Sequence, residues 1–140
     1  GYRGEGGLFI FNNIHRLMLY LALVILIMKY VDVLHTLRFH EADGTESFGF
    51  SVGTLVLAME SFLLTMYVTS CHAFRHLIGG GNRRWSLGIE KIQGSAFRIV
   101  SKINVHHGFW FWTSLVMVFL GDIFVWAVAE GVLSDPSIRI

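Results

Sequence analysis

Residues 17–28 read LMLYLALVILIM, an apolar run without a single charged side chain. A helix needs about 20 mostly apolar residues to cross the roughly 30 Å hydrocarbon layer of a bilayer. The sequence around this run stays largely apolar, and it predicts a membrane-spanning helix over residues 14–37. Two more stretches of similar character predict spanning helices over residues 48–76 and 107–132.

The composition points to the same class of protein. Of the 140 residues, 54% are hydrophobic and 15% are charged, whereas soluble domains carry about 25% charged residues. One Pro and one Cys exclude a proline-rich linker, a disulfide framework and a zinc site built from Cys pairs. The net charge of +1 argues against nucleic acid as a partner. We expect an all-α integral membrane protein with a single anchor domain over residues 1–140, and the start at Gly1 suggests a processed or partial product.

A fourth helix is predicted on the membrane surface rather than across the membrane. Apolar residues recur at spacings of three and four between residues 87 and 104, which indicates an amphipathic interfacial helix. It either connects the spans along the headgroups or docks a water-soluble protein partner. The repeating positions are Ile89, Ile92, Ala96, Val100 and Ile103.

The charges of the connections set the orientation. Residues 40–46, between the first two spans, are acidic, whereas the segment between the second and third spans is basic. Positive charge accumulates on the cytoplasmic side, so we expect this basic face to be cytoplasmic, in the inner (plasma) membrane of a cell. Eight of the eleven Lys and Arg residues lie on it: Arg3, Arg16, Arg75, Arg83, Arg84, Lys91, Arg98 and Lys102.

Four charged residues lie away from the ends of the predicted spans, at depths where a charge needs a partner or a functional role. Lys29 and Asp32 are three positions apart on one helix, so we predict that they pair with each other. Glu60 and Asp122 lie centrally in the other two helices. Each is a candidate for a proton path, or for a buried hydrogen bond to a neighbouring helix.

The segment from Cys71 to Gly80, CHAFRHLIGG, concentrates groups that suit redox chemistry. His72 and His76 are one turn apart on one helix face, and imidazole is a common ligand of haem iron and of iron–sulfur iron. Cys71 offers a thiolate. Taken singly, these are ordinary helix-end residues near the headgroups. Together they favour a redox site.

Further groups near the same membrane face extend this site. Arg75 can donate hydrogen bonds to a quinone carbonyl or to a lipid phosphate, and His76 and Trp110 are predicted near the same membrane face. His106 and His107 open the third span and are alternative haem ligands.

In order along the chain, these segments resemble a known family. The matching stretches are residues 12–16 (NNIHR), 42–45 (ADGT), 53–57 (GTLVL), 71–80 and 100–107 (VSKINVHH), followed by the aromatic third helix up to Asp122. The chain resembles the cytochrome b-type membrane anchor of succinate dehydrogenase (succinate:quinone oxidoreductase), in its mycobacterial and actinobacterial variety. The resemblance implies five spanning helices, of which this chain holds the last three.

The resemblance also implies a function. Such an anchor holds a flavoprotein and an iron–sulfur protein on the cytoplasmic face, and passes electrons from succinate to a membrane quinone. On this reading we expect the quinone to bind at Arg75, His76 and Trp110. The residues that oxidise succinate belong to the flavoprotein, so none is expected here. Other anchor helices and the lipid membrane are further expected partners.

The cofactor that the resemblance implies is a Rieske-like [2Fe-2S] cluster, with heme b as the alternative. Such a cluster needs two Cys and two His. Cys71, His72 and His76 are candidate ligands, and a second Cys would have to lie in a missing segment. Two other functions stay open at this point, namely a proton-coupled transporter fragment and the cytochrome b anchor of another respiratory dehydrogenase.

Overall fold

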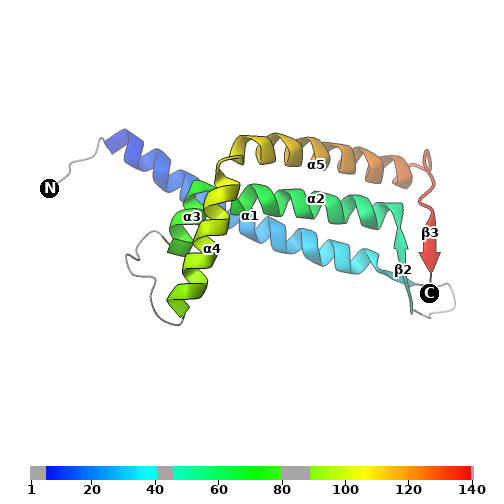
Figure 1. The fold of residues 1–140 in the computed structure, drawn as a ribbon. Coiled ribbons are helices and arrows are strands. Elements are labelled where there is room, and N and C mark those ends of the chain that lie inside the picture. Colours follow the sequence, from blue (N-terminus) through cyan, green and yellow to red (C-terminus); the bar gives the residue numbers. More distant parts are fainter. Residues whose placement is uncertain (1–5, 41–45, 80–88, 140) are drawn as a thin grey trace.

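Three long helices run side by side in the computed structural model, which describes residues 6–40, 46–79 and 89–139 (Figure 1). They are α1 (Gly6–Thr36), α2 (Val52–Thr69) and α5 (His107–Ala129). Helix α2 packs against both α1 and α5. All three are long and apolar enough to cross a membrane, which confirms the predicted helical membrane fold.

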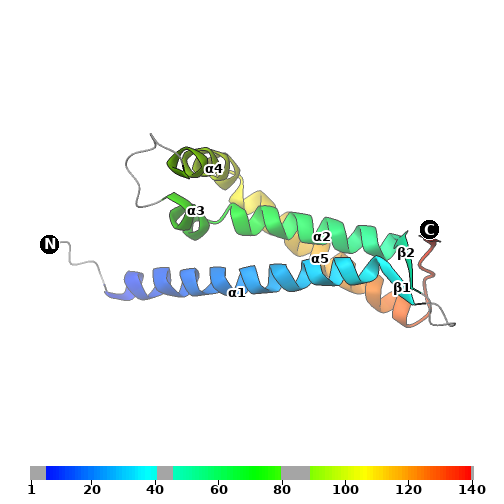
Figure 2. The same cartoon turned by 90° about the horizontal axis from the view of Figure 1, so that it is seen from below.

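The remaining elements lie at the two ends of the three spans (Figures 1 and 2). At one end, α3 (His72–Gly79) packs against α4 (Ile89–Asn104), and we call this the α3–α4 end. At the other, the sheet end, three short strands pair antiparallel in the order β1-β2-β3. These strands are β1 (Arg38–His40), β2 (Glu46–Ser51) and β3 (Ser137–Arg139).

The fold is mostly helical, as predicted, but both boundaries of the second span differ from the prediction. Residues 46–51 form a strand instead of the start of a helix. The helix predicted over residues 48–76 is also interrupted, since α2 ends at Thr69 and α3 begins at His72. At the break, the side chain of Asn104 donates a hydrogen bond of 2.6 Å to the carbonyl of Ser70. A contact from α4 thus satisfies a carbonyl that leaves the helical ladder.

The start of α2 is fixed by a local cap and by a side chain from the carboxyl-terminal segment. The Ser51 hydroxyl accepts from the Thr54 amide at 3.1 Å in a capping box. Asp135 accepts a hydrogen bond of 2.9 Å from the Gly53 amide. A Cβ on Gly53 would lie 2.9 Å from the other oxygen of Asp135. This close approach explains the glycine and attaches the carboxyl-terminal segment to α2.

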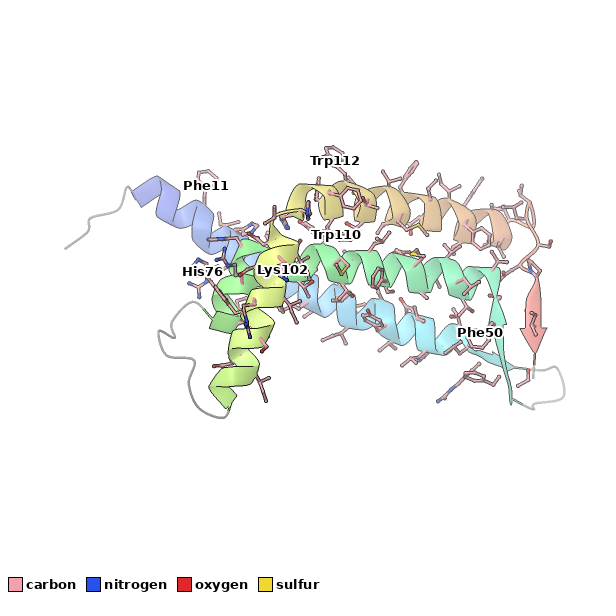
Figure 3. The ribbon with its side chains drawn as sticks, viewed as in Figure 1. Phe11, Phe50, His76, Lys102, Trp110 and Trp112 are labelled. Carbon is pink, nitrogen blue, oxygen red and sulfur yellow. The ribbon has the colours of Figure 1, made fainter. Side chains whose placement is uncertain are left out.

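The outer surface of the spans is apolar, as a lipid environment requires. Large side chains such as Ile27, Leu55 and Phe119 are 64 to 65% exposed, and Figure 3 shows such side chains projecting along the bundle. Within α2, the hydroxyls of Ser61, Thr65 and Thr69 each donate to the carbonyl four residues earlier. These bonds satisfy polar groups that lipid cannot.

Helix α4 agrees with the predicted amphipathic helix of residues 87–104. Its Val100 is buried, whereas Arg98, Ile99 and Lys102 are not. Two features of the sequence lie outside the described residues: most of the acidic turn, at 41–45, and the pair Arg83 and Arg84 of the basic segment.

Candidate functional site

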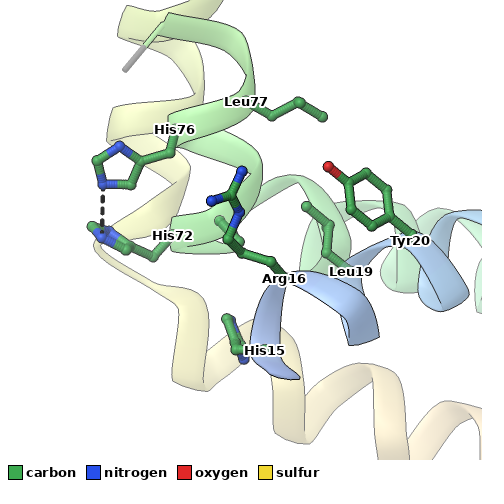
Figure 4. Close-up of a pocket in the computed structure, with 8 residues that line it drawn as sticks. His15, Arg16, Leu19, Tyr20, His72, His76 and Leu77 are labelled. Carbon is green, nitrogen blue, oxygen red and sulfur yellow. Dashed lines mark hydrogen bonds between the residues drawn. The ribbon is translucent and has the colours of Figure 1, made fainter. Parts of the chain in front are cut away.

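The α3–α4 end contains a cavity of about 560 Å³ between the amino-terminal half of α1 and helix α3 (Figure 4). Its polar lining comes from three side chains of α1 and two histidines of α3, and its apolar lining from leucines and an alanine. A cavity that combines hydrogen-bond donors with apolar walls suits an amphipathic small molecule. The lining residues are His15, Arg16, Leu19, Tyr20, His72, Ala73, His76 and Leu77.

Cys71, which lies between α2 and α3, contacts an imidazole of α1. Its thiol is buried, and Sγ lies 3.1 Å from Nε2 of His15 on α1. The segments that hold these two residues are brought together because Leu19 packs in the same buried cluster as Cys71. The sequence did not single out His15 as a ligand, since a distance of 56 positions gives no local signal.

The two histidines of α3 interact with each other. Their Nε2 atoms are 3.0 Å apart, as expected one turn apart on one helix face, and Figure 4 shows them at one side of the cavity. Burial lowers the pKa of His72 below its ordinary value of 6.5, and the charges of His76, Arg75 and His15 lower it further. His72 is therefore a neutral imidazole at pH 7, which is the form that can accept a hydrogen bond or bind a metal.

His107 is held from several sides at the start of α5. Its Nδ1 lies 2.7 Å from the hydroxyl of Ser70, which is fully buried. That hydroxyl donates its one hydrogen to the carbonyl of Tyr67 at 2.7 Å, so His107 must donate its Nδ1 hydrogen to Ser70. The ring of Tyr67 stacks on the imidazole at 5.1 Å. The Nε2 atom then carries the lone pair in the neutral form.

The other predicted site residues do not line the cavity. The guanidinium of Arg75 lies 4.9 Å from the ring centre of Phe97. His106 is exposed. Trp110 lies on α5 (Figure 3), and its buried indole nitrogen has no hydrogen-bond partner among the residues described. Only His76 among the three predicted quinone ligands lines this cavity.

One predicted ion pair is wrong. Lys29 does not pair with Asp32 on its own helix but with Glu60 on α2. The Glu60 side chain is only 1% exposed, and Lys29 is 24% exposed. A buried carboxylate needs a cation more strongly than Asp32 does, because Asp32 is exposed near the end of α1.

The two predicted proton-path residues have different surroundings. Glu60 lies between α1 and α5, where a Cβ on Gly121 would be 2.8 Å from its Oε2. Asp122 follows Gly121 but is exposed on the outside of α5. Apart from the Glu60 contact with Lys29, neither carboxylate has an ionic partner within the described part of the chain.

Comparison with known proteins identifies the family. Residues 1–131 match the model of the actinobacterial succinate dehydrogenase subunit SdhC. The chain belongs to this SdhC family. It is therefore the membrane subunit of a succinate dehydrogenase complex, and the transporter and other-dehydrogenase alternatives are set aside.

A solved structure supports the SdhC assignment. The fold is similar to a chain of the Mycobacterium smegmatis Sdh1 complex in the apo form, with a TM-score of 0.80 and 32% identity. The similarity covers all of this chain and 50% of that chain, so the SdhC segment described here spans about half the length of its relative. No curated protein sequence matches it significantly.

Proposed function

We propose that this SdhC chain passes electrons from succinate oxidation to a membrane quinone bound at the α3–α4 end. The cavity between α1 and α3 carries the proposal. Its imidazole, guanidinium and phenol groups can donate hydrogen bonds to the two carbonyl oxygens of a quinone. Leu19 and Leu77 provide apolar walls for the rest of the molecule.

The charge distribution supports docking of water-soluble subunits at the same end. Arg16, Arg75, Arg98 and Lys102 are all at the α3–α4 end of the spans. By the positive-inside rule, we infer that this end faces the cytoplasm. We place a flavoprotein and an iron–sulfur protein here, in the plasma membrane, because electrons arriving from the cytoplasm would then enter next to the cavity.

The donor groups fit a Rieske-like [2Fe-2S] cluster that this chain ligates in part. Cys71 and His15, already 3.1 Å apart, are one thiol and one imidazole of the two-Cys, two-His set. His72 or His76 would supply the second imidazole. The chain has one Cys, and within the described ranges no three His, Cys, Asp or Glu side chains converge on a metal position. The second Cys would come from outside these 140 residues, and the bound cluster would supply one-electron transfer.

Heme b remains the alternative cofactor. It would use one imidazole from each of two helices, such as His76 on α3 and His107 on α5. The Ser70 bond to Nδ1 leaves Nε2 of His107 open for such a role. His72 and His76 contact each other, so one of them would have to turn away to act as a ligand.

Low-temperature electron paramagnetic resonance of the purified complex, together with a reduced-minus-oxidised optical spectrum, distinguishes the two cofactors. A Rieske-type signal without b-haem bands supports the cluster, and Cys71→Ser should abolish that signal. A b-haem band without the Rieske signal supports heme b, and absence of both contradicts either assignment.

The quinone site is tested separately. His76→Ala in the assembled complex should impair quinone reduction while succinate oxidation with an artificial dye acceptor persists. His106→Ala is the matched control, because His106 is an exposed histidine at the same end and does not line the cavity. Unchanged quinone reduction in the His76 variant would place the quinone elsewhere.

A further inference from the structure

Asp122 sits at a depth where an exposed carboxylate is out of place. It lies seven residues before the end of α5 at Ala129, which is about 10 Å along the axis. An aspartate side chain is too short to reach the headgroups from there. Charged groups at such depth almost always face protein or a water-filled cavity, yet Asp122 is exposed on this bundle.

The face of α5 around Asp122 is apolar and exposed. Leu115, Phe119, Asp122 and Trp126 follow one another at spacings of three and four, and thus form one stripe. Phe119 and Trp126 are 64% and 61% exposed on either side of the carboxylate. We call these four residues the Asp122 stripe.

The other three charged residues that lie away from the predicted span ends have a partner or lie close to the membrane surface. Lys29 and Glu60 lie at about the same depth and pair with each other. Asp32 is only four residues from the end of α1, about 6 Å, and so lies close to the membrane surface. Within the described residues, Asp122 has no hydrogen-bond or ion-pair partner.

We propose that the Asp122 stripe is the docking face for a further membrane-spanning helix that carries a Lys or Arg in the sheet-end half of the bilayer. Charge complementarity selects this occupant, since a basic side chain would neutralise Asp122 away from water. A second copy of this chain does not provide it. The described spans are Ile14–Thr36, Val52–Thr69 and His107–Ala129. Their Lys and Arg residues are Arg16, which lies at the α3–α4 end, and Lys29, which is already paired with Glu60.

Photocrosslinking in the intact complex tests the proposal. A benzoylphenylalanine is placed at Phe119 or Trp126, and adducts are identified by mass spectrometry. We expect adducts with a membrane helix that contains a Lys or Arg. That basic residue should lie within about one helical turn of the position at which the crosslink forms. The matched control is Leu55 on α2, which is 64% exposed in an entirely apolar stripe with Met59 and Phe62. It reports the background of lipid adducts.

Substitution of the carboxylate provides a second readout. The second readout is how much of the partner helix copurifies with this SdhC chain. Asp122→Leu should lower that amount severalfold, whereas Asp122→Glu should leave it unchanged. Phe119→Leu, which keeps the charge, should also leave it unchanged. An acidic substitution of the identified basic residue should lower recovery of the partner helix. Combining it with Asp122→Lys should restore that recovery, because the two charges are then exchanged.

Three results would overturn the proposal. The first is that Phe119 and Trp126 give only lipid adducts. The second is that they give only adducts with another copy of this chain, or with a helix that has no basic residue in its span. The third is that Asp122→Leu and Phe119→Leu retain the partner helix equally.

Discussion

Lys29 on α1 and Glu60 on α2 form an ion pair inside the membrane-spanning bundle. The carboxylate is fully enclosed, and its second oxygen faces the backbone of Gly121 on α5. One buried side chain therefore joins all three spans at one depth. Because removal of one member of a buried pair leaves an uncompensated charge, this contact should govern the stability of the bundle.

The first prediction concerns this pair. Lys29→Met leaves the Glu60 carboxylate buried without its cation, so we expect the free energy of unfolding to fall by about 3 to 5 kcal/mol. The double variant with Met at both positions should recover most of the loss, since no buried charge remains. Thermal unfolding of the purified complex measures both. A double variant that is no more stable than Lys29→Met would show that the two residues are not coupled.

The second prediction concerns Gly121. Alanine there would place a Cβ 2.8 Å from Glu60 Oε2 in a packed interior, and overpacking of this kind costs about 1 to 3 kcal/mol. Gly108→Ala is the matched control on the same helix, because its added Cβ would meet no other side chain and no packed neighbour within 4 Å. It should be neutral or slightly stabilising. If the two alanine variants unfold at the same temperature, the contact between Gly121 and Glu60 is not restrictive.

The third prediction concerns a hydrogen bond between α1 and α2. The Thr65 hydroxyl donates to the Ser61 carbonyl at 2.7 Å, so Tyr30 is the donor in the 2.8 Å bond to Thr65. Interhelical hydrogen bonds in membranes average about 0.6 kcal/mol, and Tyr30→Phe should lower the stability of the complex by roughly that amount. Thr113→Val is the control, because the Thr113 hydroxyl bonds only within its own helix, to Phe109. A larger loss for the control would contradict the assignment.

The fourth prediction is a pH dependence that His72 causes. Its pKa lies below the ordinary value of 6.5 in the folded chain, so below pH 6.5 the unfolded chain binds more protons than the folded one. Stability should therefore be constant near pH 7 to 8 and should fall as the pH decreases through 6.5. Apparent melting temperatures from about pH 5 to 8 measure this, and His72→Gln should reduce the slope on the acidic side. An equal reduction in the exposed control His106→Gln would assign the slope to another cause.

The candidate site could be predicted in part. Cys71, His72 and His76 are close in sequence, and helical spacing alone places the two histidines on one face. The approach of His15 to Cys71, and of Ser70 to His107, depends on how separate helices pack. Such contacts have no periodic signature, so they could not be read from residue spacing.

The sequence by itself determined that this chain has three segments able to cross a membrane, because length and apolar character decide which segments partition into lipid. It also indicated that positive charge gathers at one end. The tertiary structure alone decided which buried charges meet. Lys29 was predicted to pair with its helical neighbour Asp32, but pairs with Glu60 because helix packing enclosed the Glu60 carboxylate and left Asp32 exposed.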